Sequence, residues 1–136
     1  MYHDPSMLTV IVAEDEFLIR MIAAEALIDA GYRVIEVEHS AAALRILQAG
    51  AEQVSALFTD INMPGKMDGL TLAHHAHAHW PWIKLLITSG AARVEVNELP
   101  LGGRFVAKPY EIVHMIRNIR EMTIDHHIGL PPLPSQ

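Results

Sequence analysis

Four apolar runs in this sequence each end on side chains that could handle a phosphoryl group together with a divalent metal ion. In chain order, the polar residues that close these runs are Glu14-Asp15, Asp60, Thr88-Ser89 and Lys108. If the runs are parallel strands of one sheet, their carboxyl ends surround one crevice, which is where open α/β sheets bind ligands. Carboxylate oxygens are the ligands that Mg²⁺ and Mn²⁺ prefer, and an ammonium group and a hydroxyl suit phosphoryl oxygens. The sequence therefore predicts a phosphoryl-handling crevice.

The segments around these runs alternate between strand and helix patterns, which predicts βαβ units and a parallel sheet. We expect strands over 8–13, 33–37, 54–59, 83–88 and 104–107. We expect helices over 17–28, 40–50 and 69–79, and a last helix from Pro109 to about residue 123. Ser40 is a plausible N-cap, and Gly31 is a plausible helix stop. Segment 91–98 contains mediocre helix formers and precedes Pro100, so a short or irregular helix is expected there.

Composition narrows the class of protein. The 136 residues fit one domain, and a net charge of −6 argues against unaided nucleic-acid binding. The absence of cysteine excludes disulfides and thiolate metal sites. No apolar run is long enough to span a bilayer, and no leader peptide is visible at the N-terminus. We therefore expect a cytoplasmic protein without membrane contacts, with a folded domain over 7–123 and a flexible, proline-rich tail over 124–136.

Taken together and in this order, each at a strand end, these motifs are specific enough to indicate one protein family. From about residue 8 to residue 122 the chain resembles the receiver domain of two-component response regulators. The matching positions are Glu14-Asp15, Asp60 with Met63-Pro64 and Met67-Asp68-Gly69 after it, Thr88 before a small residue, and Lys108-Pro109. The resemblance implies a flavodoxin-like, doubly wound sheet of five parallel strands in the order 2-1-3-4-5. Five helices would flank this sheet, and the fourth of them would be short or irregular here.

The resemblance also implies a role for each matching residue. Asp60 would be phosphorylated by a phosphohistidine of a histidine kinase or a histidine phosphotransfer protein. The expected ligands of Mg²⁺ or Mn²⁺ are Asp15, Asp60 and the backbone carbonyl of Asn62, with Glu14 acting through water. The expected phosphate-binding and switch residues are Thr88, Ser89, Lys108 and the aromatic Phe105. The family further implies a cis peptide bond before Pro109.

Partners and activity follow from the same resemblance. The kinase is expected to dock on Phe17, Leu18, Arg20 and Met21, beside the loop after Lys108. The short stretch after the last expected helix predicts a stand-alone receiver that signals through protein contacts and catalyses only its own phosphoryl transfer and dephosphorylation. One alternative is a receiver domain taken from a hybrid histidine kinase. Another is an Mg²⁺-dependent phosphatase with an aspartate nucleophile, although such enzymes carry a second Asp where this chain has Asn62.

Three departures from the family pattern and one further motif stand out. The acidic pair is Glu-Asp rather than Asp-Asp, the loop after Asp60 is one residue longer than usual, and the span from Thr88 to Lys108 is shorter. The tract His74-His75-Ala76-His77-Ala78-His79 could place histidine pairs on one helix face, where they could bind Zn²⁺ or Ni²⁺. No further ligand is obvious nearby, so we favour a solvated helix face for this tract.

Overall fold

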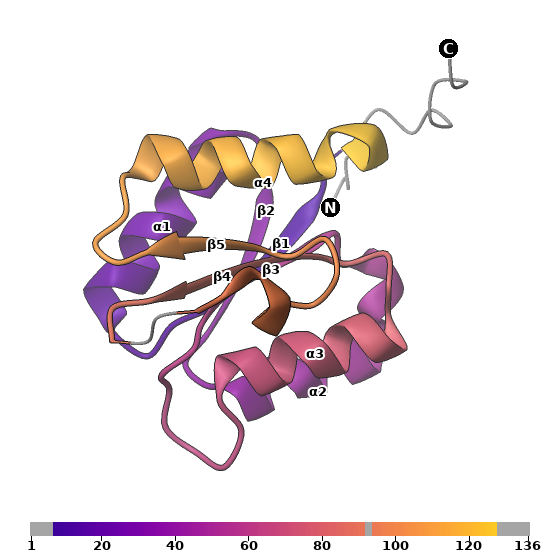
Figure 1. Ribbon diagram of the computed structural model, residues 1–136. Helices are drawn as coiled ribbons and strands as arrows, with labels where there is room; N and C mark the ends of the chain where they lie inside the picture. Colours follow the sequence, from indigo (N-terminus) through magenta and orange to yellow (C-terminus); the bar gives the residue numbers. More distant parts are fainter. Residues whose placement is uncertain (1–6, 92–93, 128–136) are drawn as a thin grey trace.

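A five-stranded parallel sheet forms the centre of the protein (Figure 1). The computed structural model describes residues 7–91 and 94–127, so residues 128–136 of the expected tail lie outside the described chain. The strands are β1 (Thr9–Ala13), β2 (Arg33–Val37), β3 (Ala56–Asp60), β4 (Lys84–Ser89) and β5 (Arg104–Ala107). They pair in the order β2-β1-β3-β4-β5, which confirms the predicted flavodoxin-like sheet.

Helices cover both faces of this sheet (Figure 1). They are α1 (Phe17–Asp29), α2 (Ser40–Gly50), α3 (Gly69–His79) and α4 (Ile112–His127). Successive side chains of β1 point to opposite faces. Ile11 packs into a core with Leu47 of α2 and Leu72 of α3, whereas Val10 packs into a second core with α1 and α4. The strands are apolar on both faces because both faces are covered.

The start of α2 differs from the prediction in its capping residue. His39 is the N-cap, because its side chain accepts a hydrogen bond from the backbone N–H of Ala42. Ser40 is instead the first helical residue, and its buried hydroxyl has no hydrogen-bond partner among the described residues. Gly31 follows α1 with a φ of 104°, a value that favours glycine, so the predicted stop is confirmed there.

The last helix begins later and ends later than predicted. Its first turn closes when Met115 N donates to Glu111 O, so the three residues after Lys108 form a loop rather than helix. The predicted cis peptide bond between Lys108 and Pro109 is present in this loop. Near the far end, Thr123 donates its hydroxyl to Ile119 O inside the helix and contacts the Tyr32 hydroxyl at 2.9 Å. Because these contacts satisfy its polar group, α4 continues past Thr123 to His127.

The region of the expected fourth family helix is irregular, as predicted. Between β4 and β5, the described residues form one short 3₁₀ helix, η2 (Val96–Glu98). A second 3₁₀ helix, η1 (Ala51–Gln53), lies elsewhere in the chain, directly after α2. Glu95 and Glu98 close a reciprocal capping box around η2. The described chain therefore has four α-helices rather than the family's five. Across the same residues, no helix is long and apolar enough to cross a membrane.

Candidate functional site

The carboxyl ends of β1, β3, β4 and β5 meet at one edge of the sheet, as the sequence predicted. Asp60 of β3 lies in register with Thr88 of β4. Backbone hydrogen bonds continue past the strand ends, since Ile61 N donates to Thr88 O at 2.9 Å and Lys108 N donates to Ser89 O at 3.0 Å. On the other side, Glu14 N donates to Val37 O of β2. The polar residues at this edge are thus fixed by sheet pairing.

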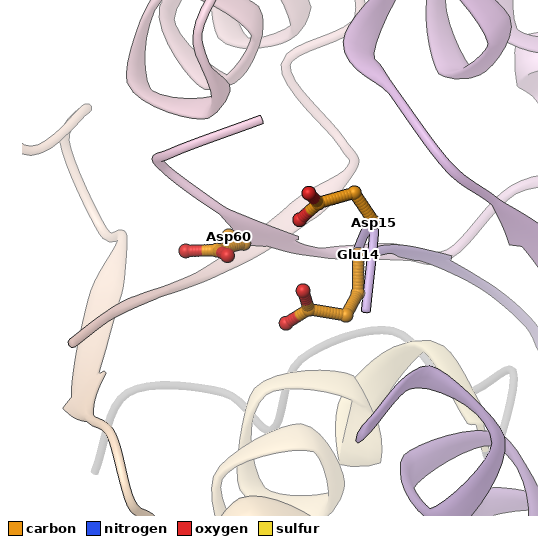
Figure 2. Close-up of side chains that lie close together, drawn as sticks. All are labelled: Glu14, Asp15 and Asp60. Carbon is orange, nitrogen blue, oxygen red and sulfur yellow. The ribbon is translucent and has the colours of Figure 1, made fainter. Parts of the chain in front are cut away.

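Three carboxylates gather in this crevice (Figure 2). Glu14, Asp15 and Asp60 each offer an oxygen, and these three oxygens lie within 4.8 Å of one another. Asp60 and Glu14 are each only 4% exposed, whereas Asp15 is exposed. The structure therefore brings the predicted acids together at one point that solvent reaches from the side of Asp15.

Lys108 supplies the cation of the crevice. Its Nζ donates to Glu14 Oε1 at 2.7 Å and to Asp60 Oδ2 at 2.9 Å, and it lies 3.8 Å from Glu16 Oε2. Burial lowers the pKa of Lys108, but the hydrogen bonds to Glu14 and Asp60 outweigh burial and raise it above its usual range. Lys108 is therefore a permanent ammonium group at neutral pH.

For Glu14, burial and the contact with Lys108 have the opposite effects on the pKa. Burial raises the pKa of Glu14, the hydrogen bond from Lys108 lowers it, and the charge of Asp60 raises it again, so the net shift is upward. Glu16 was not singled out from the sequence, yet its backbone N–H donates to Glu14 Oε2 at 3.1 Å. The run of three acids, Glu14-Asp15-Glu16, was the signal that could have revealed it.

The hydroxyl groups predicted to bind phosphate lie beside Asp60. Thr88 is 2% exposed, and its Oγ1 has no hydrogen-bond partner among the described residues. Buried hydroxyls are normally paired, so this atom keeps the capacity to accept or donate a hydrogen bond. Ser89 Oγ instead accepts from Asn62 Nδ2 at 3.1 Å and from Ala91 N at 3.2 Å. Of the two predicted hydroxyls, Thr88 is the one whose bonding capacity is unused.

The loop after Asp60 returns to pack directly against it. Gly69, the first residue of α3, donates its N–H to Ile61 O at 2.9 Å. A Cβ at this position would overlap the Asp60 carbonyl oxygen and would lie 2.8 Å from Thr59 Oγ1, so only glycine fits here. Asp68 caps α3 by accepting from Thr71 N at 2.8 Å. Gly69 therefore sets how closely α3 approaches the crevice.

The residues predicted to dock the kinase fall into two groups. Phe17 and Leu18, at the start of α1, are 60% and 64% exposed. Arg20 is only 8% exposed and donates to Glu14 O at 2.8 Å and to Glu36 Oε1 at 3.1 Å, so its side chain is engaged inside the protein and a docking role for it stays a prediction. Its guanidinium group connects α1 to β2 and to the backbone of Glu14. The side chains that point to solvent at the start of this helix are those of Phe17 and Leu18. Met21 is half-buried.

Phe105 of β5 is half-buried and packs against the core cluster that lies under α2 and α3. Tyr110, in the loop after Lys108, packs edge-on against Phe58 with ring centroids 5.4 Å apart. Burial and then the charge of Glu14 raise the pKa of Tyr110 to about 12, so its phenol stays neutral at physiological pH. The two aromatic residues thus flank the β5 end of the crevice on opposite faces of the sheet.

The crevice fits a hard divalent cation. Three carboxylates and one ammonium group leave two uncompensated negative charges, which one Mg²⁺ or Mn²⁺ ion would neutralise. All the acidic donors are oxygens, and the described residues place no histidine or cysteine in the cluster. The unpartnered hydroxyl of Thr88 adds a group suited to a phosphoryl oxygen. The donor set therefore matches the predicted metal and phosphate.

Comparison with known proteins agrees with this geometry. The family model of the response regulator receiver domain matches residues 10–120. The chain is 34% identical over 121 residues to the response regulator receiver protein CpdR of Brucella abortus (strain 2308), covering 87% of this chain and 98% of that protein. It is 32% identical over 117 residues to the sensor kinase CckA of the same organism, covering 84% of this chain but 12% of that kinase.

Solved structures agree as well. A response regulator receiver protein from Sinorhizobium medicae WSM419 superposes with a TM-score of 0.78 at 26% identity, covering 85% of this chain and 94% of that one. The region matched by the family model, residues 10–120, contains every strand end that contributes to the crevice. The chain belongs to the receiver domain family of two-component response regulators.

Proposed function

We propose that this receiver domain accepts a phosphoryl group on Asp60 from a phosphohistidine and that this modification switches its contacts with other proteins. The observation that carries the proposal is the environment of Asp60. Its carboxylate is buried, bonded to Lys108, adjacent to two further acids and in register with a buried hydroxyl that has no partner among the described residues. A carboxylate with only a structural role would not need this combination.

The proposed metal ligands are Asp15, Asp60 and the backbone carbonyl of Asn62, with Glu14 contributing through water. When bound, Mg²⁺ would supply positive charge that offsets the charge on the phosphoryl oxygens. Phosphoryl transfer depends mainly on positioning and charge stabilisation rather than on covalent help from the protein. The charge balance of the crevice supports this assignment.

The chain's own residues provide the remaining steps. A carboxylate oxygen of Asp60 attacks the phosphorus atom, the P–N bond breaks, and the imidazole leaves with that electron pair and takes a proton from solvent. Lys108 already donates a hydrogen bond to Asp60 Oδ2, so its ammonium group can also donate to an oxygen of the phosphoryl group once that group is attached to Asp60. Thr88 would donate its unused hydroxyl to a phosphoryl oxygen. Phe105 would respond to the movement of Thr88 as the switch aromatic.

The phosphodonor protein would dock next to Lys108. A surface hollow of about 430 Å³ lies there, lined mainly by apolar residues: Ile19, Ile22, Gly90, Lys108, Pro109, Tyr110 and Ile112. The exposed side chains of Phe17 and Leu18 lie on the same helix, α1, as two of these lining residues. An apolar helix face of a histidine kinase or phosphotransfer protein fits this surface, since an exposed apolar patch marks an interaction site.

The experiment that tests the proposal is intact-mass measurement after incubation with acetyl phosphate and Mg²⁺. The protein should gain one phosphoryl group that is stable in acid and labile in base. Asp60→Asn preserves the shape of the side chain but removes the nucleophile, so it should abolish the gain. Asp68→Asn is the matched control, because Asp68 is an exposed acid in the same loop and should leave the gain unchanged.

Two results would contradict the proposal. One is a phosphoryl group that persists at the wild-type level in Asp60→Asn. The other is steady turnover of a generic phosphomonoester, which would indicate a phosphatase with an aspartate nucleophile instead of a phosphoacceptor.

A further inference from the structure

The histidine tract of α3 contains one pair of histidines whose rings lie in direct contact. His75 and His79 lie one helical turn apart, and their rings stack with centroids 4.1 Å apart and planes inclined by 21°. We propose that this pair binds a divalent transition-metal ion of the Zn²⁺, Cu²⁺ or Ni²⁺ class, with water completing the coordination. The sequence alone favoured a solvated face here, and the ring geometry changes that interpretation.

The hydrogen bonding of His79 selects the nitrogen that would face the metal. His79 Nδ1 lies 3.0 Å from His75 O, and because a carbonyl oxygen can only accept, Nδ1 carries the proton. The Nε2 atom of the neutral ring is then left with its lone pair, which is the arrangement seen in metal-binding histidines that donate their other N–H to a carbonyl. His75 makes no ring hydrogen bond within the described chain, so either of its nitrogens can turn toward the same ion.

The position of the pair on the helix favours a cation. His79 is the last residue of α3, where unpaired carbonyl groups carry the negative end of the helix dipole. Trp80 then closes the helix, and its ring lies 5.9 Å from that of His75 and 5.7 Å from that of His79. The indole forms an apolar wall against which both imidazoles are held, so less side-chain freedom is lost when a metal binds.

Imidazole nitrogen determines which metals this site would take. Neutral imidazole is a good ligand for Zn²⁺, Cu²⁺ and Ni²⁺, whereas Mg²⁺ and Ca²⁺ prefer oxygen. The site is therefore chemically distinct from the acidic crevice. It is also separate in space, because the crevice adjoins Gly69 at one end of α3 and His79 lies at the other, about 15 Å away along the helix axis.

The other histidines of the same helix serve as a matched comparison. His74 Nε2 lies 2.7 Å from Glu98 O, so this ring holds the η2 segment against α3. His74 and His77 are three residues apart, and no ring contact joins them within the described chain. A double variant at these positions removes as many imidazoles from α3 as one at His75 and His79 does.

The test is a titration of the full chain with Cu²⁺ in excess Mg²⁺, followed by tryptophan fluorescence, with Zn²⁺ calorimetry for stoichiometry. Trp80 and Trp82 are the two tryptophans of the chain, so a paramagnetic ion held beside Trp80 should quench its emission. The wild-type protein should show saturable quenching with one equivalent. His75→Gln/His79→Gln should weaken it at least about tenfold, as expected when a chelating pair is lost, whereas His74→Gln/His77→Gln should leave it unchanged.

Two outcomes would overturn the site. Equal quenching in His75→Gln/His79→Gln and the wild-type protein would exclude the pair, and equal losses in both double variants would mean that the ion is bound diffusely along α3. Ring NMR signals of the unmodified protein give an independent check that needs no variant. Zn²⁺ should shift the signals of His75 and His79 at the first equivalent, and shifts confined to other histidines would refute the proposal.

Discussion

Removing the ammonium group of Lys108 should destabilise the metal-free protein by an amount that Mg²⁺ restores. In Lys108→Met the aliphatic stem is largely retained, but Glu14 and Asp60, both 4% exposed, lose their cation. Stripping one partner from a buried ion pair costs roughly 3–5 kcal/mol. The Lys108 side chain is 14% exposed and Asp15 opens the crevice to water, so we expect a loss of about 2–3 kcal/mol in unfolding free energy.

Urea unfolding at neutral pH, with EDTA or with Mg²⁺, measures this effect. Because the ion and the ammonium group neutralise the same carboxylates, Mg²⁺ should stabilise Lys108→Met more than the wild-type protein, and an excess of 100 times the dissociation constant contributes about 2.7 kcal/mol. Lys84→Met is the control. Lys84 is an exposed lysine at the start of β4 and should respond to neither condition.

The same reasoning fixes the sign of the pH dependence. Burial already raises the pKa of Glu14 in the folded protein, and loss of Lys108 raises it further. The folded variant therefore binds more protons than its unfolded chain, so its stability falls as pH rises, and its deficit should shrink as pH is lowered toward about 5. A variant as stable as wild type in EDTA at pH 7, or a deficit that grows on acidification, would refute this account of the crevice.

The remaining predictions concern single positions and the segment before β5. Thr88→Val removes a buried hydroxyl without a partner in the described chain, so the free energy of unfolding of the unmodified protein, measured by thermal unfolding, should rise by about 1 kcal/mol. A loss of stability would reveal a hidden partner. Gly69→Ala should lower the free energy of unfolding in urea by more than about 3 kcal/mol because its Cβ overlaps Asp60. Gly50→Ala, whose Cβ would meet only Glu52 Oε1 at 4.0 Å, should be nearly neutral, and equal effects would contradict the packing. Arg20→Gln should lower the free energy of unfolding by about 1–3 kcal/mol and weaken Mg²⁺ binding measured by calorimetry, because Arg20 donates a hydrogen bond to the Glu14 carbonyl. Unchanged Mg²⁺ affinity would limit Arg20 to a structural role. Segment 94–101 should exchange its amide hydrogens faster than β4, and equal protection would show that η2 is as stable as the sheet.

The sheet and the acids were predictable because both depend on short-range patterns. Apolar runs of strand length that alternate with helical periodicity specify a parallel sheet, and a parallel sheet brings the carboxyl ends of its strands to one edge. The positions of Glu14, Asp60 and Lys108 at those ends therefore followed from the residues that precede each of them. Their mutual distances required only that the strands pair in the predicted order.

Helix ends and side-chain directions were less predictable because neighbours in space decide them. His39 rather than Ser40 caps α2, although serine is the more usual cap, because the Ser40 side chain is turned into the buried interior. α4 begins at Ile112 and not at Pro109 because Tyr110 packs against Phe58 and the chain reaches the helix only afterwards. Neither choice can be read from local propensity.

Arg20 illustrates the same limit for function. As a charged residue on the helix that follows the acidic pair, it fitted a docking role in the sequence. In the fold, one of its nitrogens reaches the carbonyl of Glu14, six residues away, and another reaches Glu36 on β2, 16 residues away. The partner of a long, flexible side chain depends on which strand lies opposite, so the residue type alone could not distinguish a surface contact from an internal one.

Thr88 sets the scale of the switch that we propose. A buried hydroxyl without a partner costs about 1–3 kcal/mol, and this cost is present in the unmodified protein. If a phosphoryl oxygen on Asp60 supplies the missing partner, the modified protein recovers that free energy only in the conformation in which Thr88 reaches the phosphate. A differential of this size shifts a two-state equilibrium about 5- to 150-fold. The half-buried Phe105 lies on β5, next to β4, and under this proposal its side chain would change position when the equilibrium shifts. In Thr88→Val we therefore expect Asp60 to accept the phosphoryl group without the change in conformation that follows in the wild-type protein.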